Sequence, residues 1–318
     1  MFVWLTGFYG PQGCFTVKNN LTKNQHYVPR VYLRGWTPQG WARDAETGRQ
    51  VMAHFLEQQS SEPRNSKSIL HAKWFYEENP SQPDNYIENM FGEHEASWSK
   101  VMSFTTFVAD NARTDYRKTP STRETEEQYV CRTLVSMLCT LPRYADSIKN
   151  FACISYFRTP SALRQKRAEL NHPQGPGGTI ELDLSAFEFA SQAMSSSLRE
   201  RFAGLNILLL VASESSFVTS DRPCFDLDLA QSESAPLMGY DIGRLETVVG
   251  YFPLSARFAV LFVPKVLKTD TQTLNTPAIR VLSLPERAVR EFNQLTVDMD
   301  SEIVVSTHDF TSIEQIVA

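Results

Sequence analysis

The sequence predicts an α+β protein, in which a helix-rich N-terminal two-thirds packs on a mixed β-sheet formed mainly by the C-terminal third. In the middle of the chain, apolar residues recur every three or four positions, which is the period of an amphipathic helix. After Gly204, short continuous apolar runs replace this period, and such runs are typical of buried strands. Because strands and helices do not alternate regularly, we do not expect repeated βαβ units.

The helical part should contain three main helices. The first should begin behind Asp84, which can cap it, and the second should begin with Ser121 and Glu124 as a capping box and end before Pro142. A third is expected at about residues 183–202. The buried stripe of the first helix would hold Ile87, Phe91, Trp98 and Met102.

The strands are expected where apolar runs are bounded by Pro, Ser or charged residues. These runs are Ile207–Val211, Phe217–Thr219, Leu245–Phe252, Phe258–Val263 and Ile279–Leu282. A helix from Pro285 to about Met299, capped by Ser283 with Glu286, should follow. The chain should then end with a strand at Ile303–Val305 and a short helix.

We expect residues 23–318 to form one domain, preceded by an N-terminal extension at residues 1–22. A chain of 318 residues, of which 42% are hydrophobic, can bury one large core or two modest ones. Residues 171–180 are a possible hinge or loop, because the prolines there lack backbone donors and the glycines are costly to fix. The apolar start of the chain is interrupted by glycines and a proline, so no membrane segment is expected.

The composition limits the partners and the compartment. A net charge of −5 gives no overall attraction to nucleic acid or to an anionic membrane, so either would need a local patch. The five cysteines follow neither a disulfide nor a metal-ligand spacing, which predicts reduced thiols and a cytoplasmic location. P-loop, G-x-G-x-x-G, H-E-x-x-H and paired C-x-x-C motifs are absent, so we expect no cofactor and no metal.

The first segment with chemical potential is N-Q-H-Y-V-P-R at residues 24–30. It gathers the imidazole of His26, the phenol of Tyr27 and the guanidinium of Arg30 next to apolar residues. His26 is therefore a candidate general base or substrate donor, because an imidazole titrates near neutral pH. The alternative is a structural histidine whose hydrogen bonds are satisfied within the fold.

The second segment is T-S-D-R-P at residues 219–223, where a polar cluster ends a predicted strand. Strand ends often line ligand crevices, so Ser220 and Asp221 are candidate catalytic residues and Arg222 a candidate substrate contact. No G-x-S-x-G elbow surrounds Ser220, and the alternative is that Ser and Asp stabilise a turn.

Two carboxylates, Glu88 and Glu95, lie two helical turns apart on the apolar stripe of the first predicted helix. A half-buried carboxylate needs a cationic partner. That partner is either an arginine of the same chain or the guanidinium or amine of a substrate, which bidentate hydrogen bonds would favour.

The densest basic cluster of the chain comprises Arg158, Arg164, Lys166 and Arg167. It is a candidate nucleic-acid contact, because clustered cations bind phosphates. The alternative is a solvated helix face.

These motifs resemble a widespread domain of unknown function that is recognised by an N-terminal H-Y-V-P and a later T-S-D-x-P. The likeness covers about residues 24–306 and includes L-P-R at 141–143 and F-P-L-S at 252–255. Arg222 stands where that family more often has asparagine, which changes the local hydrogen bonding.

The sequence also looks like the fungal arginine-containing cyclodipeptide synthases. That resemblance implies an enzyme that takes arginyl-tRNA and a second aminoacyl-tRNA and joins the two amino acids into a cyclic dipeptide. It implies carboxylates for the arginine side chain, a base, oxyanion donors and a basic surface for tRNA. The candidates are Glu88, Glu95 and Asp221 for the first, His26 for the second, Ser220 or Tyr27 for the third, and the basic cluster for the last.

Two other functions fit the same residues. A hydrolase, for example a nuclease, would combine His26 and Asp221 with the basic cluster, whereas a non-catalytic binding protein would need neither residue. Every catalytic hypothesis requires the two motif segments and the helix-borne carboxylates to meet at one site.

Overall fold

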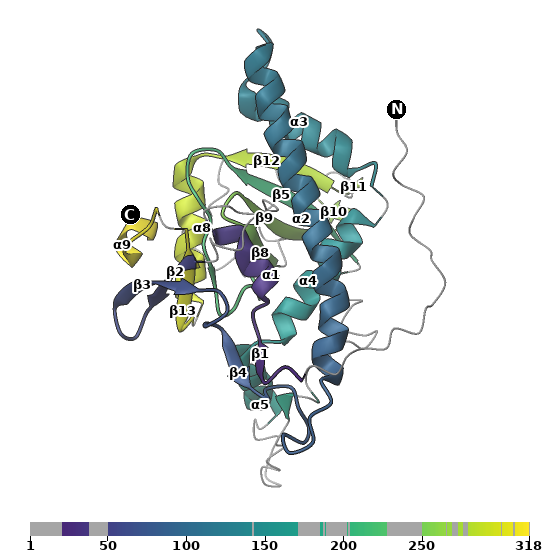
Figure 1. The fold of residues 1–318 in the computed structure, drawn as a ribbon. Coiled ribbons are helices and arrows are strands. Elements are labelled where there is room, and N and C mark those ends of the chain that lie inside the picture. Colours follow the sequence, from purple (N-terminus) through teal and green to yellow (C-terminus); the bar gives the residue numbers. More distant parts are fainter. Residues whose placement is uncertain are drawn as a thin grey trace.

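The centre of the fold is a five-stranded mixed sheet, in the order β12-β5-β9-β8-β7 (Figure 1). β12 (Ile279–Leu284) is parallel to β5 (Leu205–Ala212), whereas β9 (Phe258–Pro264), β8 (Gly250–Ser255) and β7 (Phe225–Asp226) continue the sheet in antiparallel pairs. The computed structural model describes residues 21–37, 50–141, 143–170, 204–227, 250–264, 266–268, 273–275, 279–299, 301–307 and 309–317, with 185, 186, 188 and 202. The predicted α+β class is confirmed.

Strand β5 shows why the apolar run has no alternation. Ile207, Leu209 and Val211 face a core that is shared with the helices of the first half of the chain. Leu208 and Leu210 face the opposite way, toward helix α8 (Glu286–Asp298). Because side chains alternate along a strand, a strand with both faces covered is apolar at every position. The sheet therefore lies between two layers of helices (Figure 1).

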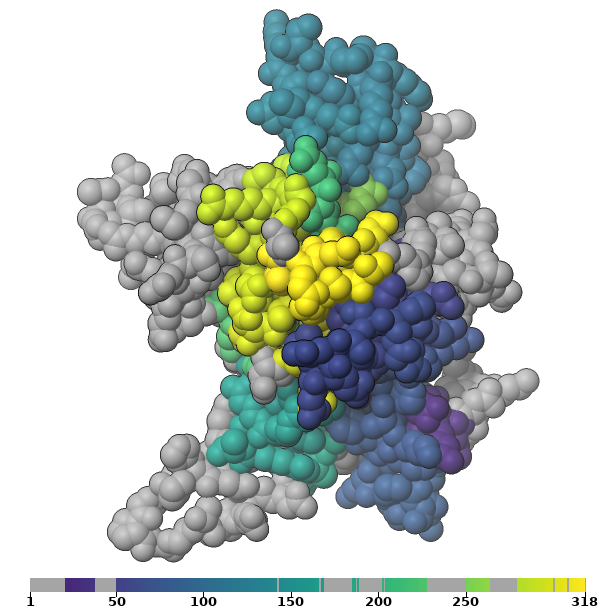
Figure 2. All heavy atoms as spheres, turned by 90° about the vertical axis from the view of Figure 1, so that its left-hand side faces the viewer, coloured from purple at the N-terminus to yellow at the C-terminus, as the bar shows by residue number. Residues whose placement is uncertain are grey.

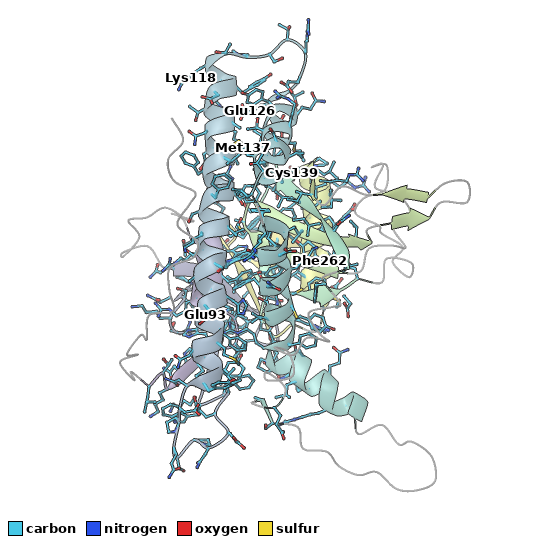
Figure 3. The ribbon with its side chains drawn as sticks, turned by 90° about the vertical axis from the view of Figure 1, so that its right-hand side faces the viewer. Glu93, Lys118, Glu126, Met137, Cys139 and Phe262 are labelled. Carbon is cyan, nitrogen blue, oxygen red and sulfur yellow. The ribbon has the colours of Figure 1, made fainter. Side chains whose placement is uncertain are left out.

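Among the described residues, the layer on the first face is formed by the helices α2 (Tyr86–Lys118), α3 (Glu126–Leu138), α4 (Tyr144–Phe157) and α5 (Pro160–Leu170). With 33 residues, α2 is about 50 Å long at the usual rise per residue. Figure 3 shows α3 lying along the end of α2 that carries Lys118, with Glu93 toward the opposite end. The helix thus connects two distant parts of the molecule.

A second, fully antiparallel sheet has the order β3-β2-β13-β6. It joins the hairpin of β2 (Gln50–Phe55) and β3 (Ser60–Asn65) to β13 (Ile303–Ser306) and β6 (Thr219–Ser220). Figure 2 shows this hairpin beside the C-terminal helix α9 (Ile313–Val317). The buried His54 links three strands, because its Nδ1 lies 2.7 Å from Ser61 Oγ and its Nε2 lies 2.8 Å from Ser306 Oγ.

The N-terminal motif forms β1 (Asn24–His26), α1 (Arg30–Leu33) and the 3-10 turn η1 (Arg34–Trp36), and β1 pairs with β4 (His71–Lys73). The Tyr32 hydroxyl donates to the Pro253 carbonyl at 2.6 Å and lies 2.8 Å from Thr219 Oγ1. Trp36 Nε1 donates to the Phe217 carbonyl at 2.8 Å. The early and late motifs are therefore joined inside the core.

A further pair, β10 (Val266–Lys268) and β11 (Thr273–Asn275), completes the described strands.

Gly35 is required by this close packing. A Cβ atom at this position would lie 2.8 Å from the Cα of Ser255, which is closer than two such carbons approach each other. Glycine lets the backbone of η1 lie directly against β8.

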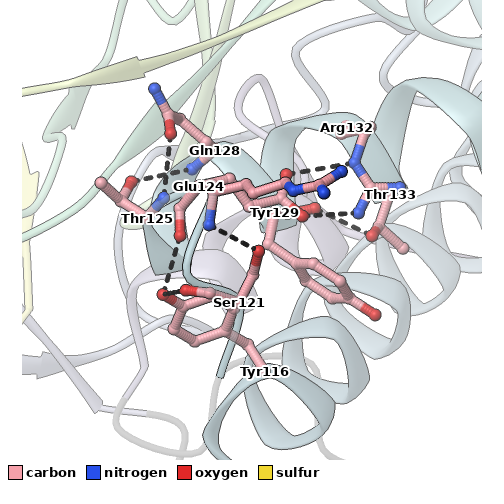
Figure 4. Close-up of polar contacts among 9 residues, drawn as sticks. Tyr116, Ser121, Glu124, Thr125, Gln128, Tyr129, Arg132 and Thr133 are labelled. Carbon is pink, nitrogen blue, oxygen red and sulfur yellow. Dashed lines mark hydrogen bonds and ion pairs between the residues drawn. The ribbon is translucent and has the colours of Figure 1, made fainter. Parts of the chain in front are cut away.

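The capping box of α3 differs from the predicted one. Thr125 and Gln128 form it, with Gln128 N donating to Thr125 Oγ1 at 3.2 Å and Thr125 N donating to Gln128 Oε1 at 2.9 Å (Figure 4). Ser121 instead accepts a bond from Arg123 N, and Glu124 pairs with Arg132. Both candidate pairs have the same spacing, so the spacing alone cannot distinguish them.

Other predicted boundaries shift by a few residues. α2 begins at Tyr86, whose backbone N donates to Asp84 Oδ1, so Asp84 stands one position before the N-cap Asn85. Helix α8 begins behind Pro285, without a side-chain cap from Ser283. The possible hinge at 171–180, most of the helix expected at 183–202, residues 1–20 and residues 245–249 lie outside the described residues. Each described helix is too short or too polar to span a lipid bilayer.

Candidate functional site

The candidate site is organised by a buried guanidinium. Arg158, which ends α4, is only 1% exposed and packs with its Cζ 4.3 Å from the centre of the Phe91 ring. Its Nη1 donates to Glu95 Oε1 at 3.0 Å, and its Nη2 donates to the carbonyl oxygen of His26. Its own carbonyl accepts a bond from the Tyr76 hydroxyl at 2.5 Å. One side chain thus links β1, α2 and the end of α4.

The charge of Arg158 is stabilised by its neighbours. Burial by itself would lower the pKa of this guanidinium, but Tyr76, Glu95 and Glu88 hold the pKa above its ordinary value. A buried charge of this kind is stable only when paired and hydrogen-bonded. Arg158 and Glu95 therefore form an internal ion pair, which is the structural alternative for Glu95.

Glu88 lies on the acidic side of this cluster and is not matched by a cation of its own. Its Oε2 is buried and has no hydrogen-bond partner among the described residues. Burial raises the pKa of Glu88 to about 7, with further increases from Glu95 and Glu77 that the charge of Arg158 opposes. A carboxyl group with such a pKa is about half protonated at neutral pH, so a cationic ligand would ionise it fully.

His26 and His71 form the basic side of the cluster. They face each other across the β1–β4 pair, with ring centroids 5.1 Å apart in an edge-on arrangement. His26 Nε2, His71 Nδ1 and Arg158 Nε are buried without a hydrogen-bond partner in the described part of the chain. Burial, followed by the charges of His71, Arg30 and Arg158, lowers the pKa of His26 to about 4, while a backbone hydrogen bond to Lys67 acts in the opposite direction.

Unsatisfied buried polar atoms are rare in folded proteins, because each costs about 1–3 kcal/mol. Here, oxygen and nitrogen atoms of this kind gather around one guanidinium: Glu88 Oε2, His26 Nε2, His71 Nδ1 and Arg158 Nε. A ligand that entered this cluster would complete the hydrogen bonds of these atoms. Among the described residues, no group of three or more His, Cys, Asp or Glu side chains could hold a metal ion.

The two sequence motifs approach each other at Tyr27 and Asp221. Burial raises the pKa of Tyr27 to about 12, and the nearby negative charges of Asp221 and Glu302 act in the same direction. His26, by contrast, makes no hydrogen bond to Asp221 in the described structure, and its charged neighbours are His71, Arg30 and Arg158. The pairing of His26 with Asp221 that a hydrolase would use is therefore not formed.

Asp221 stabilises the start of β13. Its carboxylate accepts bonds from Glu302 N at 3.2 Å and Ile303 N at 3.5 Å, and burial raises its pKa to about 6. Ser220 is fully buried, and its Oγ accepts a bond from Arg222 N at 3.1 Å and donates to the Arg222 carbonyl at 3.1 Å. The Arg222 side chain donates to Gln165 Oε1 at 2.9 Å. These contacts are those of a closed turn.

This geometry predicts the effect of two substitutions at Asp221. Asp221→Ala should lower the free energy of unfolding by about 1–3 kcal/mol, because two backbone N–H groups lose their acceptor. Asp221→Asn should cost less, since it keeps an oxygen acceptor and removes a buried charge. Urea unfolding of both variants measures this difference. Equal losses in the two variants would show that charge, and not hydrogen bonding, is what this position needs.

The predicted basic cluster does not form one surface. Arg158 is buried, so it does not belong to an exposed basic face and stands instead at the centre of the buried cluster. The Arg164 side chain is 53% exposed and pairs with Glu302 at 2.9 Å, and Arg167 is half-buried. The side chain of Lys166 lies outside the described residues.

Sequence patterns missed several members of the site. His71, Tyr76 and Glu77 belong to none of the motifs, and the pairing of β1 with β4 brings His71 opposite His26. Gln25 connects them, because its Nε2 donates to Glu77 Oε1 at 2.5 Å and its Oε1 accepts from Tyr76 N at 2.7 Å. The glutamine of the N-Q-H-Y-V-P motif therefore orients the segment that carries these residues.

The comparison with known protein families gives one result. The family described as "Protein of unknown function (DUF4238)" matches residues 24–309. This range contains both the H-Y-V-P and the T-S-D-R-P segments and all the residues of the Arg158 cluster. Neither the curated proteins nor the solved structures include a match to the chain. The match covers most of the chain, and the protein thus belongs to the DUF4238 family of proteins of unknown function.

Proposed function

We propose that this protein is an aminoacyl-tRNA-dependent cyclodipeptide synthase that takes arginine from arginyl-tRNA and joins it to a second amino acid. The observation that carries the proposal is the half-buried Glu88, whose Oε2 is buried and has no hydrogen-bond partner among the described residues. The motif order that resembles the fungal arginine-containing synthases supports the same reaction.

Charge matching selects Glu88 as the anchor for the substrate guanidinium. Glu95 already neutralises Arg158, whereas Glu88 keeps one oxygen available. A guanidinium offers a planar fork of donors that fits a carboxylate with two hydrogen bonds. Its binding would lower the pKa of Glu88, since a positive charge favours the ionised carboxyl group. Affinity for arginine should therefore increase as the pH rises toward 8.

The reaction itself needs no nucleotide energy, because the aminoacyl ester is already activated. The amine of one aminoacyl group attacks the ester carbonyl of the other, forms an amide bond and releases the 3′ hydroxyl of one tRNA. A second attack by the remaining amine closes the ring and releases the other tRNA. The site must accept a proton from each amine and stabilise each oxyanion.

Two residues of the early motif suit these tasks. His26 is neutral at pH 7, and its unpartnered Nε2 can accept a proton. Tyr27 keeps its hydroxyl proton at this pH and can donate a hydrogen bond to an oxyanion. The Ser220 hydroxyl is engaged in its own turn, so we assign it a structural role. A cytoplasmic location follows from the proposal, since charged tRNAs are made there.

The direct test is to incubate the purified protein with arginyl-tRNA and, in turn, with each other aminoacyl-tRNA. Mass spectrometry should detect a cyclo-Arg-Xaa product in at least one mixture, and uncharged tRNA should yield none. Absence of product with every arginine-containing pair would rule out the proposal. Degradation of the tRNA in place of product formation would favour the hydrolase.

A further inference from the structure

The basic side of the Arg158 cluster has more positive than negative neighbours. His26 on β1 faces His71 on β4, and the charges of Arg30 on α1 and of Arg158 at the end of α4 also act on it. These groups come from four separate elements of the fold. The carboxylate of Glu95, which Arg158 contacts, is already neutralised by that ion pair. A cation would therefore be repelled from the histidine pair.

The same groups offer unused hydrogen-bonding atoms in a buried place. His26 is 8% exposed and Arg158 is 1% exposed, yet His26 Nε2 and Arg158 Nε have no partner among the described residues. His71 Nδ1 is in the same condition. A buried donor without an acceptor is costly, and an oxyanion has enough lone pairs to accept from several donors at once.

We infer that His71, Arg30 and Arg158, which lie around His26, bind a tetrahedral oxyanion, namely a phosphate group of the bound nucleic acid. Imidazole and guanidinium groups are suited to this ligand, because both donate charge-assisted hydrogen bonds to phosphate oxygens.

The arrangement fits a ligand with opposite charges at two ends. Arg158 contacts both sides of the cluster, because it donates to Glu95 on α2 and to the His26 carbonyl on β1. Its charge acts on Glu88 as well as on His26. Arginyl-tRNA carries a guanidinium and, close to the aminoacylated sugar, a backbone phosphate. The identity of the anion as a tRNA phosphate rests on the proposed function, whereas the existence of an oxyanion site does not.

The experiment is calorimetric titration of the full-length protein with sodium sulfate, a tetrahedral dianion that does not titrate near neutral pH. The wild type should bind sulfate, and His71→Phe, which keeps an aromatic ring opposite His26, should weaken binding by about tenfold or more. Arg30→Met should have a similar effect. Arg64→Met is the matched control, because Arg64 is exposed and pairs with Glu62 on β3. The sulfate affinity of this variant should equal that of the wild type.

Competition identifies the source of the anion. The 3′-terminal trinucleotide common to tRNAs should displace sulfate, whereas acetate should not. Displacement by acetate alone would overturn the phosphate assignment, and unchanged sulfate affinity in both His71→Phe and Arg30→Met would overturn the site. Circular dichroism checks that each variant is folded. If one of His71→Phe and Arg30→Met unfolds, the other alone is compared with the wild type.

The outcomes for the two proposals are separable. Sulfate binding that depends on His71, without any cyclic product, would leave the anion site standing and remove the synthase. If the protein forms cyclo-Arg-Xaa but does not bind sulfate, and if His71→Phe does not change product formation, the synthase stands and the anion site is removed.

Discussion

Replacement of Glu88 by glutamine should make the folded protein more stable at alkaline pH and remove its use of arginine. The pKa of Glu88 is about 7 in the folded protein and 4.5 in an unperturbed chain, so the folded state binds the proton more tightly. Stability contributed by this group is therefore complete below about pH 4.5, falls as the pH rises to about 7 and stays low above it. The difference corresponds to about 3 kcal/mol.

Urea unfolding at pH 5 and pH 8 measures this effect. Glu88→Gln should gain up to about 3 kcal/mol over the wild type at pH 8 and much less at pH 5. Formation of cyclo-Arg-Xaa should fall on the order of 100-fold, because a charge-assisted pair with the substrate is lost. Glu93→Gln is the matched control, since Glu93 is exposed on the same helix (Figure 3). A variant that loses stability at pH 8 would identify Glu88 as part of an internal salt bridge.

The substitution Arg158→Met should destabilise the protein by about 3–5 kcal/mol. It keeps much of the side-chain volume over Phe91 but removes the donors to Glu95 and to the His26 carbonyl. The half-buried carboxylates of Glu88 and Glu95 then lose the positive charge of Arg158 that acts on both. Chemical denaturation at pH 7 measures the loss, and Arg164→Met, at an exposed pair, should change stability by less than about 1 kcal/mol.

A double variant separates the ion pair from the rest of the Arg158 network. Glu95→Gln combined with Arg158→Met should be less destabilised than the sum of the two single changes, because the second change removes the charge that the first leaves unpaired. Strict additivity would mean that the bonds to His26 and Tyr76, and not the pair with Glu95, determine the stability of this region.

Much of the sheet could be predicted from the sequence. β5 and β9 are buried apolar runs, β12 and β13 form where short apolar runs predicted them, and α8 has a clear amphipathic period, so local pattern and final structure agree. The expected strand at 217–219 is shorter, because Asn293 replaces its strand partner: Asn293 Oδ1 accepts from Val218 N at 3.0 Å. A helix side chain thus satisfies a backbone group that a strand would otherwise use.

The hairpin of β2 and β3 escaped prediction for a different reason. β3 reads S-S-E-P-R-N and lies at the sheet edge with mostly exposed side chains, so it carries no apolar signal. Proline and charged residues are common on such edges, where they discourage pairing with other chains.

The convergence of the candidate site could be predicted only in part. The motifs named Glu88, Glu95, His26 and Tyr27, but no local pattern connects Arg158 to a glutamate 63 positions earlier or to the backbone of β1. From the sequence alone, Arg158 could equally belong to a solvated helix face or to a buried network. Its role depends on how α2, α4 and β1 pack.

The small sheet of β1 and β4 has a consequence for motion. It consists of two three-residue strands, a size that is barely stable by itself in water. Its attachment to the larger body relies on side chains such as Arg158 and Gln25. Amide hydrogens in β1 and β4 should therefore exchange with deuterium sooner than those of β5, through openings that leave the main core folded. Occupancy of the adjoining site would slow that exchange, which makes this ribbon a natural reporter of ligand capture.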